Sequence, residues 1–251
     1  MSQFPASSAG RRPPRGRRRS PAGPAGAPPA SSASRQRPAA GESVPAPAKK
    51  ARNAYHHGNL RQALVDQAVA TIGARGVEAL TLREVGASLR VSRTALYRHF
   101  ADKTALLAAV AAQGFRAFRD ALQEGWDHGG RGRAGFIGMG RAYFRFALAH
   151  PSHYRVMFGG FVTKAACDPG LEAEAGDAFG VLAGAITELQ GQGLVRAGDP
   201  MALGVYVWAS THGLAMLAID GQLGRKDVPL DALVAVLLDR VWDGLARSPR
   251  A

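Results

Sequence analysis

The fold of this chain is decided by TLREVGASLRVSRTALYRHF, residues 81–100. Thr81 followed three residues later by Glu84 is the pattern of a capping box, which predicts the start of a helix about two turns long. Ser92 is a second residue of the type that caps helix N-termini, so a further helix is expected directly after it. The stretch therefore predicts two short helices joined by a tight turn.

The second of these helices is expected to have one buried edge and one outward face. Leu96 and Phe100 are four residues apart and define the buried edge. The outward face carries the side chains of Arg93, Thr94, Tyr97 and Arg98. Arginine can bond guanine O6 and N7, and threonine and tyrosine hydroxyls can reach phosphates, so we expect a helix-turn-helix that enters the major groove of DNA. The alternative is an ordinary solvated helix face, which uses the same residue types.

Apolar periodicity on both sides of this stretch predicts an all-α chain without strands. Nine helices are expected, at about residues 59–72, 81–89, 92–100, 102–127, 135–149, 152–158, 170–191, 200–220 and 229–247. We expect Gly73 and Gly76 to end the first of them. No stretch approaches the roughly 18 consecutive apolar residues of a membrane-spanning helix, because Ser210, Thr211 and His212 interrupt the most apolar one, so no membrane span is expected.

The net charge of +13 lies mainly in the first 52 residues, which hold 11 of the 32 Lys and Arg residues and one of the 19 acidic residues. The same segment holds ten of the 15 prolines and lacks apolar periodicity, so we expect a disordered tail. Two interpretations stay open: a basic arm that attracts phosphates, and a solvated leader without a fixed role. The one cysteine, Cys167, excludes an intrachain disulfide and fits a reducing cytoplasm.

A longer run, residues 55–107, resembles the DNA-binding domain of the TetR family of repressors. It reads YHHGNLRQALVDQAVATIGARGVEALTLREVGASLRVSRTALYRHFADKTALL. The resemblance implies DNA contacts from Thr81, Arg83, Ser92, Arg93, Thr94, Tyr97, His99 and Lys103. Many relatives have glycine or proline where this chain has Thr94 and Ala95. We therefore expect its base contacts to differ from theirs, and its operator sequence cannot be inferred from the operators of relatives.

The C-terminal part resembles a TetR subgroup named for a Trp-His-Gly signature. The resemblance rests on HPSHYRVMFG, residues 150–159, and WASTHGLAM, residues 208–216. It implies a small-molecule pocket lined by Phe136, Met139, Tyr143, Phe146, Tyr154, Met157, Phe158, Phe179, Trp208 and His212, with a largely apolar effector. The alternative is that these side chains form an ordinary helical core, in which Trp208 packs and His212 is a buried histidine with satisfied hydrogen bonds.

The family organisation predicts three parts: a basic tail over residues 1–52, a DNA-binding domain over 53–104 and an effector-binding and dimerisation domain over 105–251. The last two predicted helices carry wider apolar runs than one packed face needs. The family pairs such helices in a four-helix bundle, so a homodimer is expected on a pseudo-palindromic site in double-stranded DNA. The expected function is a repressor that an effector releases by moving the helix at 102–127. A helical ligand-binding dimer without specific DNA binding is the alternative.

An enzyme is the alternative from another class, and the sequence gives no positive sign of one. The pairs His56 and His57, and His150 and His153, have no carboxylate or cysteine at a matching interval, so no metal site is expected. The sequence has no GxSxG and no GxxxxGK pattern, and no GxGxxG follows a predicted strand, so we expect no catalytic residues and no cofactor.

Overall fold

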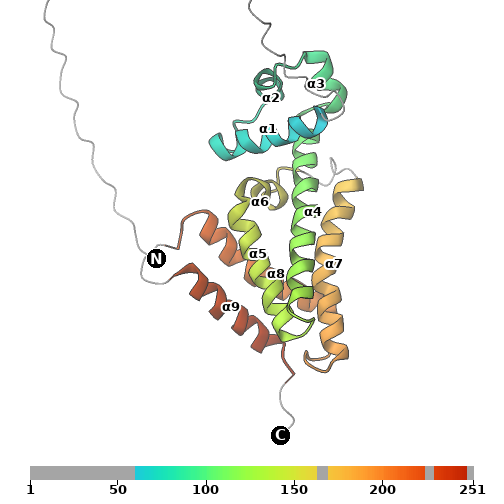
Figure 1. Ribbon diagram of the computed structural model, residues 1–251, viewed down its shortest axis with the longest axis vertical. Helices are drawn as coiled ribbons and strands as arrows, with labels where there is room; N and C mark the ends of the chain where they lie inside the picture. Colours follow the sequence, from blue (N-terminus) through green and yellow to red (C-terminus); the bar gives the residue numbers. More distant parts are fainter. Residues whose placement is uncertain (1–59, 163–168, 224–228, 248–251) are drawn as a thin grey trace, which may run out of the picture. The chain divides into compact units, whose positions relative to one another are not determined.

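The computed structural model describes residues 60–162, 169–223 and 229–247, all within the compact unit Asn53–Ala251. Figure 1 shows the nine helices of these ranges. They are α1 (Leu60–Arg75), α2 (Leu82–Ser88), α3 (Arg93–His99), α4 (Lys103–His128), α5 (Arg133–Ala149), α6 (Pro151–Phe158), α7 (Pro169–Gly191), α8 (Pro200–Ile219) and α9 (Leu230–Leu245). The all-α prediction is confirmed, since the described residues add only an isolated bridge between Val195 and Ala246. The predicted tail, His56, His57 and Cys167 lie outside the described residues.

Side-chain caps begin the helices of the DNA-binding region. The Thr81 hydroxyl accepts from the backbone N–H of Glu84 at 3.3 Å, and the Ser92 hydroxyl accepts from the N–H three residues later at 3.2 Å. Asp102 caps α4 in the same way at 2.8 Å. Each cap satisfies an N–H that has no partner within its helix, so the start of each helix is fixed by its own local sequence.

The ends of these helices depend on backbone conformation. Gly76, with φ of 85°, ends α1, but Gly73 lies inside that helix, so the prediction that Gly73 also ends it was wrong. A Cβ on Gly73 would lie 3.1 Å from the Ser152 hydroxyl, so this glycine lets α1 approach α6 closely. The turn between α2 and α3 places Arg90 at φ of 56°, where the Val91 N–H bonds the carbonyl of residue 86 at 2.9 Å.

Helix α4 is the longest helix, and it packs against α1, α5, α6 and α7. Its crossing with α5 brings backbone against backbone at Gly125 and Gly138. A Cβ on Gly138 would lie 2.5 Å from the Gly125 carbonyl oxygen, and one on Gly125 would lie 2.8 Å from the Gly138 carbonyl oxygen. Only glycine fits at this distance, so the two glycines set how closely α4 and α5 pack.

Helix α8 holds the most apolar stretch of the sequence, and it is the one described helix that is long and apolar enough to cross a membrane by length and composition alone. It has 20 residues, and an 18-residue window of it has a mean hydropathy of 1.4 with 22% of that window buried. Its polar residues Ser210, Thr211 and His212 interrupt the apolar run but carry no fixed charge, so the average stays high. Length and composition alone also fit a helix that is covered by protein, and α8 packs against α5, α7 and α9.

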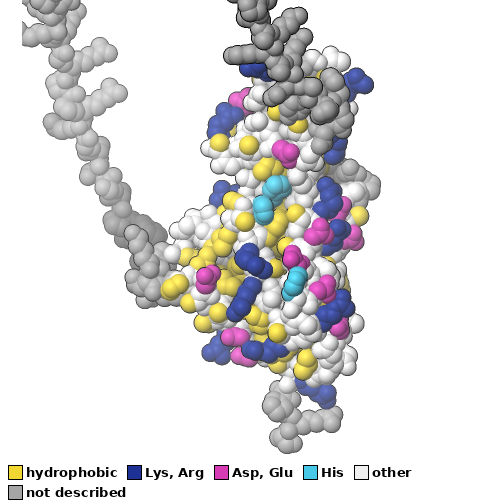
Figure 2. Space-filling model, viewed as in Figure 1, with side chains coloured by type: hydrophobic (Ala, Val, Ile, Leu, Met, Phe, Trp, Pro, Cys, Tyr) yellow, Lys and Arg dark blue, Asp and Glu magenta, His cyan; other side chains and the backbone are white. Residues whose placement is uncertain are grey.

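Apolar side chains remain exposed on α8 and α9. They are Met201, Val205, Tyr206, Trp208, Leu217 and Val236, with exposed fractions from 37% to 60%. Figure 2 shows apolar side chains gathered over the part of this face where α8 and α9 lie in Figure 1. Exposed apolar side chains that gather in one area are typical of an interaction site.

Candidate DNA-binding surface and ligand pocket

The buried edge of α3 holds it against α2 and α1. Leu96 and Phe100 are each 2% exposed, as the sequence predicted. A Cβ on Gly86 of α2 would lie 3.1 Å from the Leu96 side chain, so this glycine allows the close packing of α2 and α3. The Arg61 guanidinium lies 5.1 Å above the ring of Phe100, within cation–π distance. These contacts hold α3 in place.

The outward face of α3 is exposed and unpaired. Arg93, Thr94 and Tyr97 are exposed, and Tyr97 keeps 51% of its surface open. Arg83 at the start of α2 and His99 at the end of α3 are exposed as well. Within the described part of the chain, the side chains of these five residues form no hydrogen bond or ion pair. Their donors are therefore available to an external partner, which is what a groove-reading helix needs.

The remaining candidate DNA contacts are already engaged inside the protein. The Ser92 hydroxyl caps α3, and the Thr81 hydroxyl donates to the Glu84 carboxylate at 3.1 Å. Lys103 donates from Nζ to the carbonyl oxygens of Val77 at 2.8 Å and Glu78 at 3.2 Å. Lys103 thereby ties the start of α4 to the loop between α1 and α2. Phosphate contacts from Thr81, Ser92 and Lys103 stay predictions.

Glu84 shows how the start of α2 is held electrostatically. Its carboxylate accepts from both terminal nitrogens of Arg75, at 3.2 and 2.9 Å. The hydrogen bond from Arg75 is the main cause that lowers the pKa of Glu84, and the bond from Thr81 lowers it further. A full capping box would also require the Glu84 carboxylate to accept a hydrogen bond from the Thr81 backbone N–H. Here the carboxylate pairs with Arg75 instead.

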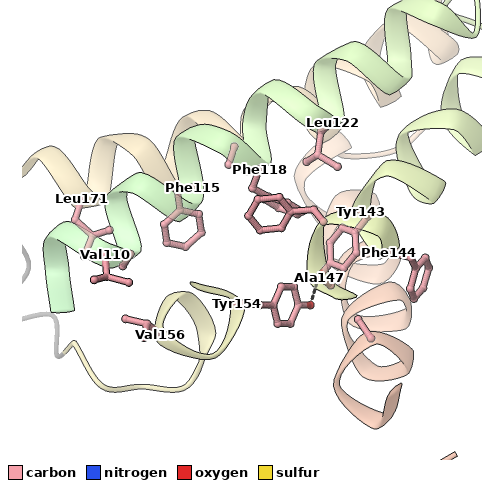
Figure 3. Packing of buried hydrophobic residues seen from close by; sticks show 14 of the residues in the cluster. Val110, Phe115, Phe118, Leu122, Tyr143, Phe144, Ala147, Tyr154, Val156 and Leu171 are labelled. Carbon is pink, nitrogen blue, oxygen red and sulfur yellow. Dashed lines mark hydrogen bonds between the residues drawn. The ribbon is translucent and has the colours of Figure 1, made fainter. Parts of the chain in front are cut away.

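A cavity of about 480 Å³ lies among α4, α5, α6, α7 and α8, with Leu238 of α9. This volume is within the usual range for small-molecule sites, about 300–1,000 Å³. Figure 3 shows Phe115, Phe118 and Leu122 along one face of α4, with Phe118 beside Tyr143. The wall is formed by Phe115, Phe118, Leu122, Phe136, Met139, Gly140, Tyr143, Met157, Phe158, Glu172, Ala175, Gly176, Ala178, Phe179, Leu182, Val207, Trp208, Thr211 and Leu238.

Seven of the ten sequence-predicted pocket residues lie on this wall. They are Phe136, Met139, Tyr143, Met157, Phe158, Phe179 and Trp208. Phe146, Tyr154 and His212 do not line the cavity. Phe146 packs on Phe118 with ring centroids 5.1 Å apart, and Tyr154 stacks on His212 at 5.5 Å. These three support wall residues from behind, and contact with an effector stays a prediction for all ten.

Sequence reasoning missed the contribution of α4 to the wall. Phe115 and Phe118 lie within the helix predicted at 102–127, where two aromatic rings three residues apart were the available signal. It also missed Glu172 and Thr211. Whether these two residues face the cavity depends on how α7 and α8 are rotated relative to α4. The apolar pattern of a single helix does not contain this information.

Three polar groups form a chain that reaches the cavity wall. The Tyr143 and Tyr154 hydroxyls are 2.6 Å apart, drawn as a dashed line in Figure 3, and the Tyr154 hydroxyl is 2.7 Å from His212 Nδ1. Burial raises the pKa of Tyr143 to about 12, and burial also raises the pKa of Tyr154. Burial lowers the pKa of His212. All three groups are therefore neutral near pH 7.

Comparison with known families gives two matches that cover most of the described chain. Residues 64–110 match the family described as bacterial regulatory proteins, tetR family. Residues 136–241 match the family described as tetracyclin repressor-like, C-terminal domain. The more specific Trp-His-Gly subgroup stays a prediction. Among curated proteins, no match was found.

Solved structures agree with these family matches. A protein of unknown function from Rhodococcus sp. RHA1 is 32% identical, with a TM-score of 0.70 over 78% of this chain and 100% of that one. A TetR-family transcriptional regulator from Pectobacterium atrosepticum is 25% identical, with a TM-score of 0.54 over 76% of this chain and 95% of that one. A TetR family transcription regulator from Marinobacter aquaeolei VT8, 21% identical over 74% of this chain and 95% of that one, shares the fold with a TM-score of 0.58. With both family matches on one all-helical chain, the protein belongs to the TetR family of transcriptional regulators.

Proposed function

We propose that this regulator is a repressor that leaves its DNA site when a small molecule enters the cavity. The observation that carries the proposal is that α4 takes part in both sites. Phe115, Phe118 and Leu122 of α4 form cavity wall, while Lys103 at its first turn holds the loop between α1 and α2. A ligand that shifts α4 therefore changes the position of the helices that carry the DNA contacts.

Helix α6 offers a second connection between the two sites. Met157 and Phe158 lie on the cavity wall, and Ser152 at the other end of α6 faces Gly73 of α1. Arg155 of α6 also pairs with Asp220, just after α8, at 2.8 Å. A ligand that binds one arrangement of α4 and α6 better than the other shifts the population toward it, and the DNA affinity changes by the same coupling free energy.

The proposed assembly is a homodimer through α8 and α9. Their exposed apolar side chains, among them Met201, Val205 and Val236, need a cover that the described residues of the single chain do not supply. A two-fold partner would cover them with the same surface and would present two α3 helices to one duplex. A pseudo-palindromic site with a fixed half-site separation follows from that symmetry. We propose a cytoplasmic location and no catalytic activity for this dimer.

Filling the cavity with a side chain tests the release mechanism without a known effector. Ala175 of α7 lines the cavity, whereas Ala173 of the same helix is exposed and does not. We expect Ala175→Phe to weaken binding to a DNA site selected from a random pool by about 5- to 150-fold, because it mimics a bound ligand. Ala173→Phe is the matched control and should bind that site as the wild type does, both measured by fluorescence anisotropy.

The release mechanism fails if Ala175→Phe binds the selected site as tightly as wild type while the cavity no longer takes up biphenyl in calorimetry. Circular dichroism would establish that both variants are folded. If specific DNA binding persists in every cavity variant, the protein is still a DNA-binding regulator. Binding of a small molecule in this cavity then does not release it from DNA.

A further inference from the structure

We propose that the cavity takes an aromatic molecule that is neutral or positively charged and carries one hydroxyl group, which bonds Tyr143, and that it rejects anions. The identification of this molecule as the effector rests on the proposed function. The binding preference itself rests only on the wall of the cavity, and it is tested without DNA.

The apolar part of the wall favours flat aromatic rings. Phe118 and Tyr143 meet edge to face with ring centroids 5.0 Å apart, and Phe115 and Phe158 do so at 5.5 Å. Trp208 continues this surface, with its ring 5.9 Å from Phe158. Aromatic rings prefer such edge-to-face and offset contacts, so a ligand ring can join the arrangement without disturbing it.

Tyr143 carries one of the two hydroxyl groups of the described cavity wall, and its partners Tyr154 and His212 lie behind that wall. If His212 Nδ1 accepts from Tyr154, then Tyr154 accepts from Tyr143, and the Tyr143 oxygen offers a lone pair to the cavity. If Nδ1 donates, the Tyr154 hydrogen is free to bond the Tyr143 oxygen, and Tyr143 can then offer its own hydrogen. A ligand hydroxyl is both donor and acceptor, so it can pair with Tyr143 in either arrangement.

The other hydroxyl on the wall does not compete for this role. Thr211 donates to the carbonyl oxygens of Val207 at 3.0 Å and Trp208 at 3.1 Å, within its own helix. Its hydrogen is therefore used, and a ligand can reach only its lone pairs. Of the two hydroxyl groups on the described wall, that of Tyr143 is therefore the one that can orient a bound molecule.

The charges around the cavity disfavour anions. No Lys, Arg or His lies among the described residues of the wall, and its one charged side chain is the exposed Glu172. The nearby Arg116 and Arg119 of α4 are held by Glu174 at 3.2 and 3.5 Å. A buried anion would have no opposite charge to pair with, whereas an ammonium group finds a carboxylate at Glu172 and aromatic faces beside it.

Four biphenyl probes that differ in one substituent test this preference by isothermal titration calorimetry at pH 7.5. Biphenyl-4-ol should bind about 2- to 13-fold tighter than biphenyl, which is the usual net worth of one hydrogen bond. Biphenyl-4-carboxylate should bind at least about tenfold more weakly than biphenyl. Biphenyl-4-ylmethylammonium should bind at least as tightly as biphenyl. Equal affinity of the carboxylate and the phenol, or no binding of any probe, would overturn the proposal.

Two variants assign these preferences to residues. Tyr143→Phe should abolish the advantage of biphenyl-4-ol over biphenyl. Glu172→Gln should weaken only the ammonium probe, and Asp177→Asn, on the same helix but off the cavity wall, should change none of the four affinities. A phenol advantage that survives in Tyr143→Phe contradicts the assignment. If the probes bind in the expected order but none lowers DNA affinity, the release mechanism fails and this inference stands.

Discussion

Replacing Gly138 with alanine should lower the free energy of unfolding by about 1–3 kcal/mol, the usual cost of overpacking. The added Cβ would lie 2.5 Å from the carbonyl oxygen of Gly125, and this oxygen belongs to a helix backbone that cannot rotate away. Helices α4 and α5 must therefore separate along their contact. Urea denaturation at a fixed protein concentration, followed by circular dichroism, measures the change.

Gly180→Ala is the matched control for this prediction. Gly180 lies inside α7, where an added Cβ meets nothing within 4 Å. Alanine reduces the freedom of the unfolded chain and suits a helix, so this variant should be more stable than wild type by about 0.4–1 kcal/mol. Equal changes in both variants would show that the close approach of α4 and α5 is not what Gly138 provides.

Replacing Arg93 with alanine should reduce affinity for a selected DNA site by about 1–3 kcal/mol, or roughly 5- to 150-fold. Arg93 is exposed on α3 and pairs with nothing in the described chain, so the loss would come from the complex and not from folding. Preference should relax at one base pair of each half-site. Anisotropy titrations against the selected site and its single-base variants measure both effects.

Arg141→Ala is the control for charge alone. Arg141 lies on α5, is exposed, and likewise has no partner in the described residues. Removing the Arg141 side chain changes the net charge by the same amount as Arg93→Ala. Because Arg141 lies outside the DNA-binding helices, the affinity for the selected DNA site should stay close to that of wild type. If Arg93→Ala lost equal affinity on selected and random duplexes, Arg93 would be a phosphate contact and not a base contact.

Local signals in the sequence were sufficient to predict the helix starts. Thr81 and Ser92 each cap the helix that follows, as their positions indicated. The division of α3 into buried Leu96 and exposed Tyr97 also followed from spacing alone. These features depend on residues within one or two turns of each other, so a pattern in the sequence contains them.

Features that depend on how helices face each other could not be predicted. Tyr154 and His212 were grouped with the cavity wall because they lie in the two patches that resemble the Trp-His-Gly subgroup. In the structure they lie behind the wall and bond each other at 2.7 Å. Lys103 was assigned to DNA, while in the structure it bonds carbonyls from a loop 25 residues earlier in the chain. Tertiary packing decides both placements, and no periodicity encodes it.

The central claim is that this chain reads a specific DNA sequence through α3. The most direct measurement is selection of bound duplexes from a random pool by the full-length wild-type protein, followed by titration of the enriched sequence against random DNA at several salt concentrations. We expect an enriched, pseudo-palindromic site that binds at least about a thousandfold tighter than random DNA. The Arg93→Ala variant should lose preference at one position of each half-site. Enrichment of no sequence, with equal and salt-sensitive binding to all duplexes, would contradict the account.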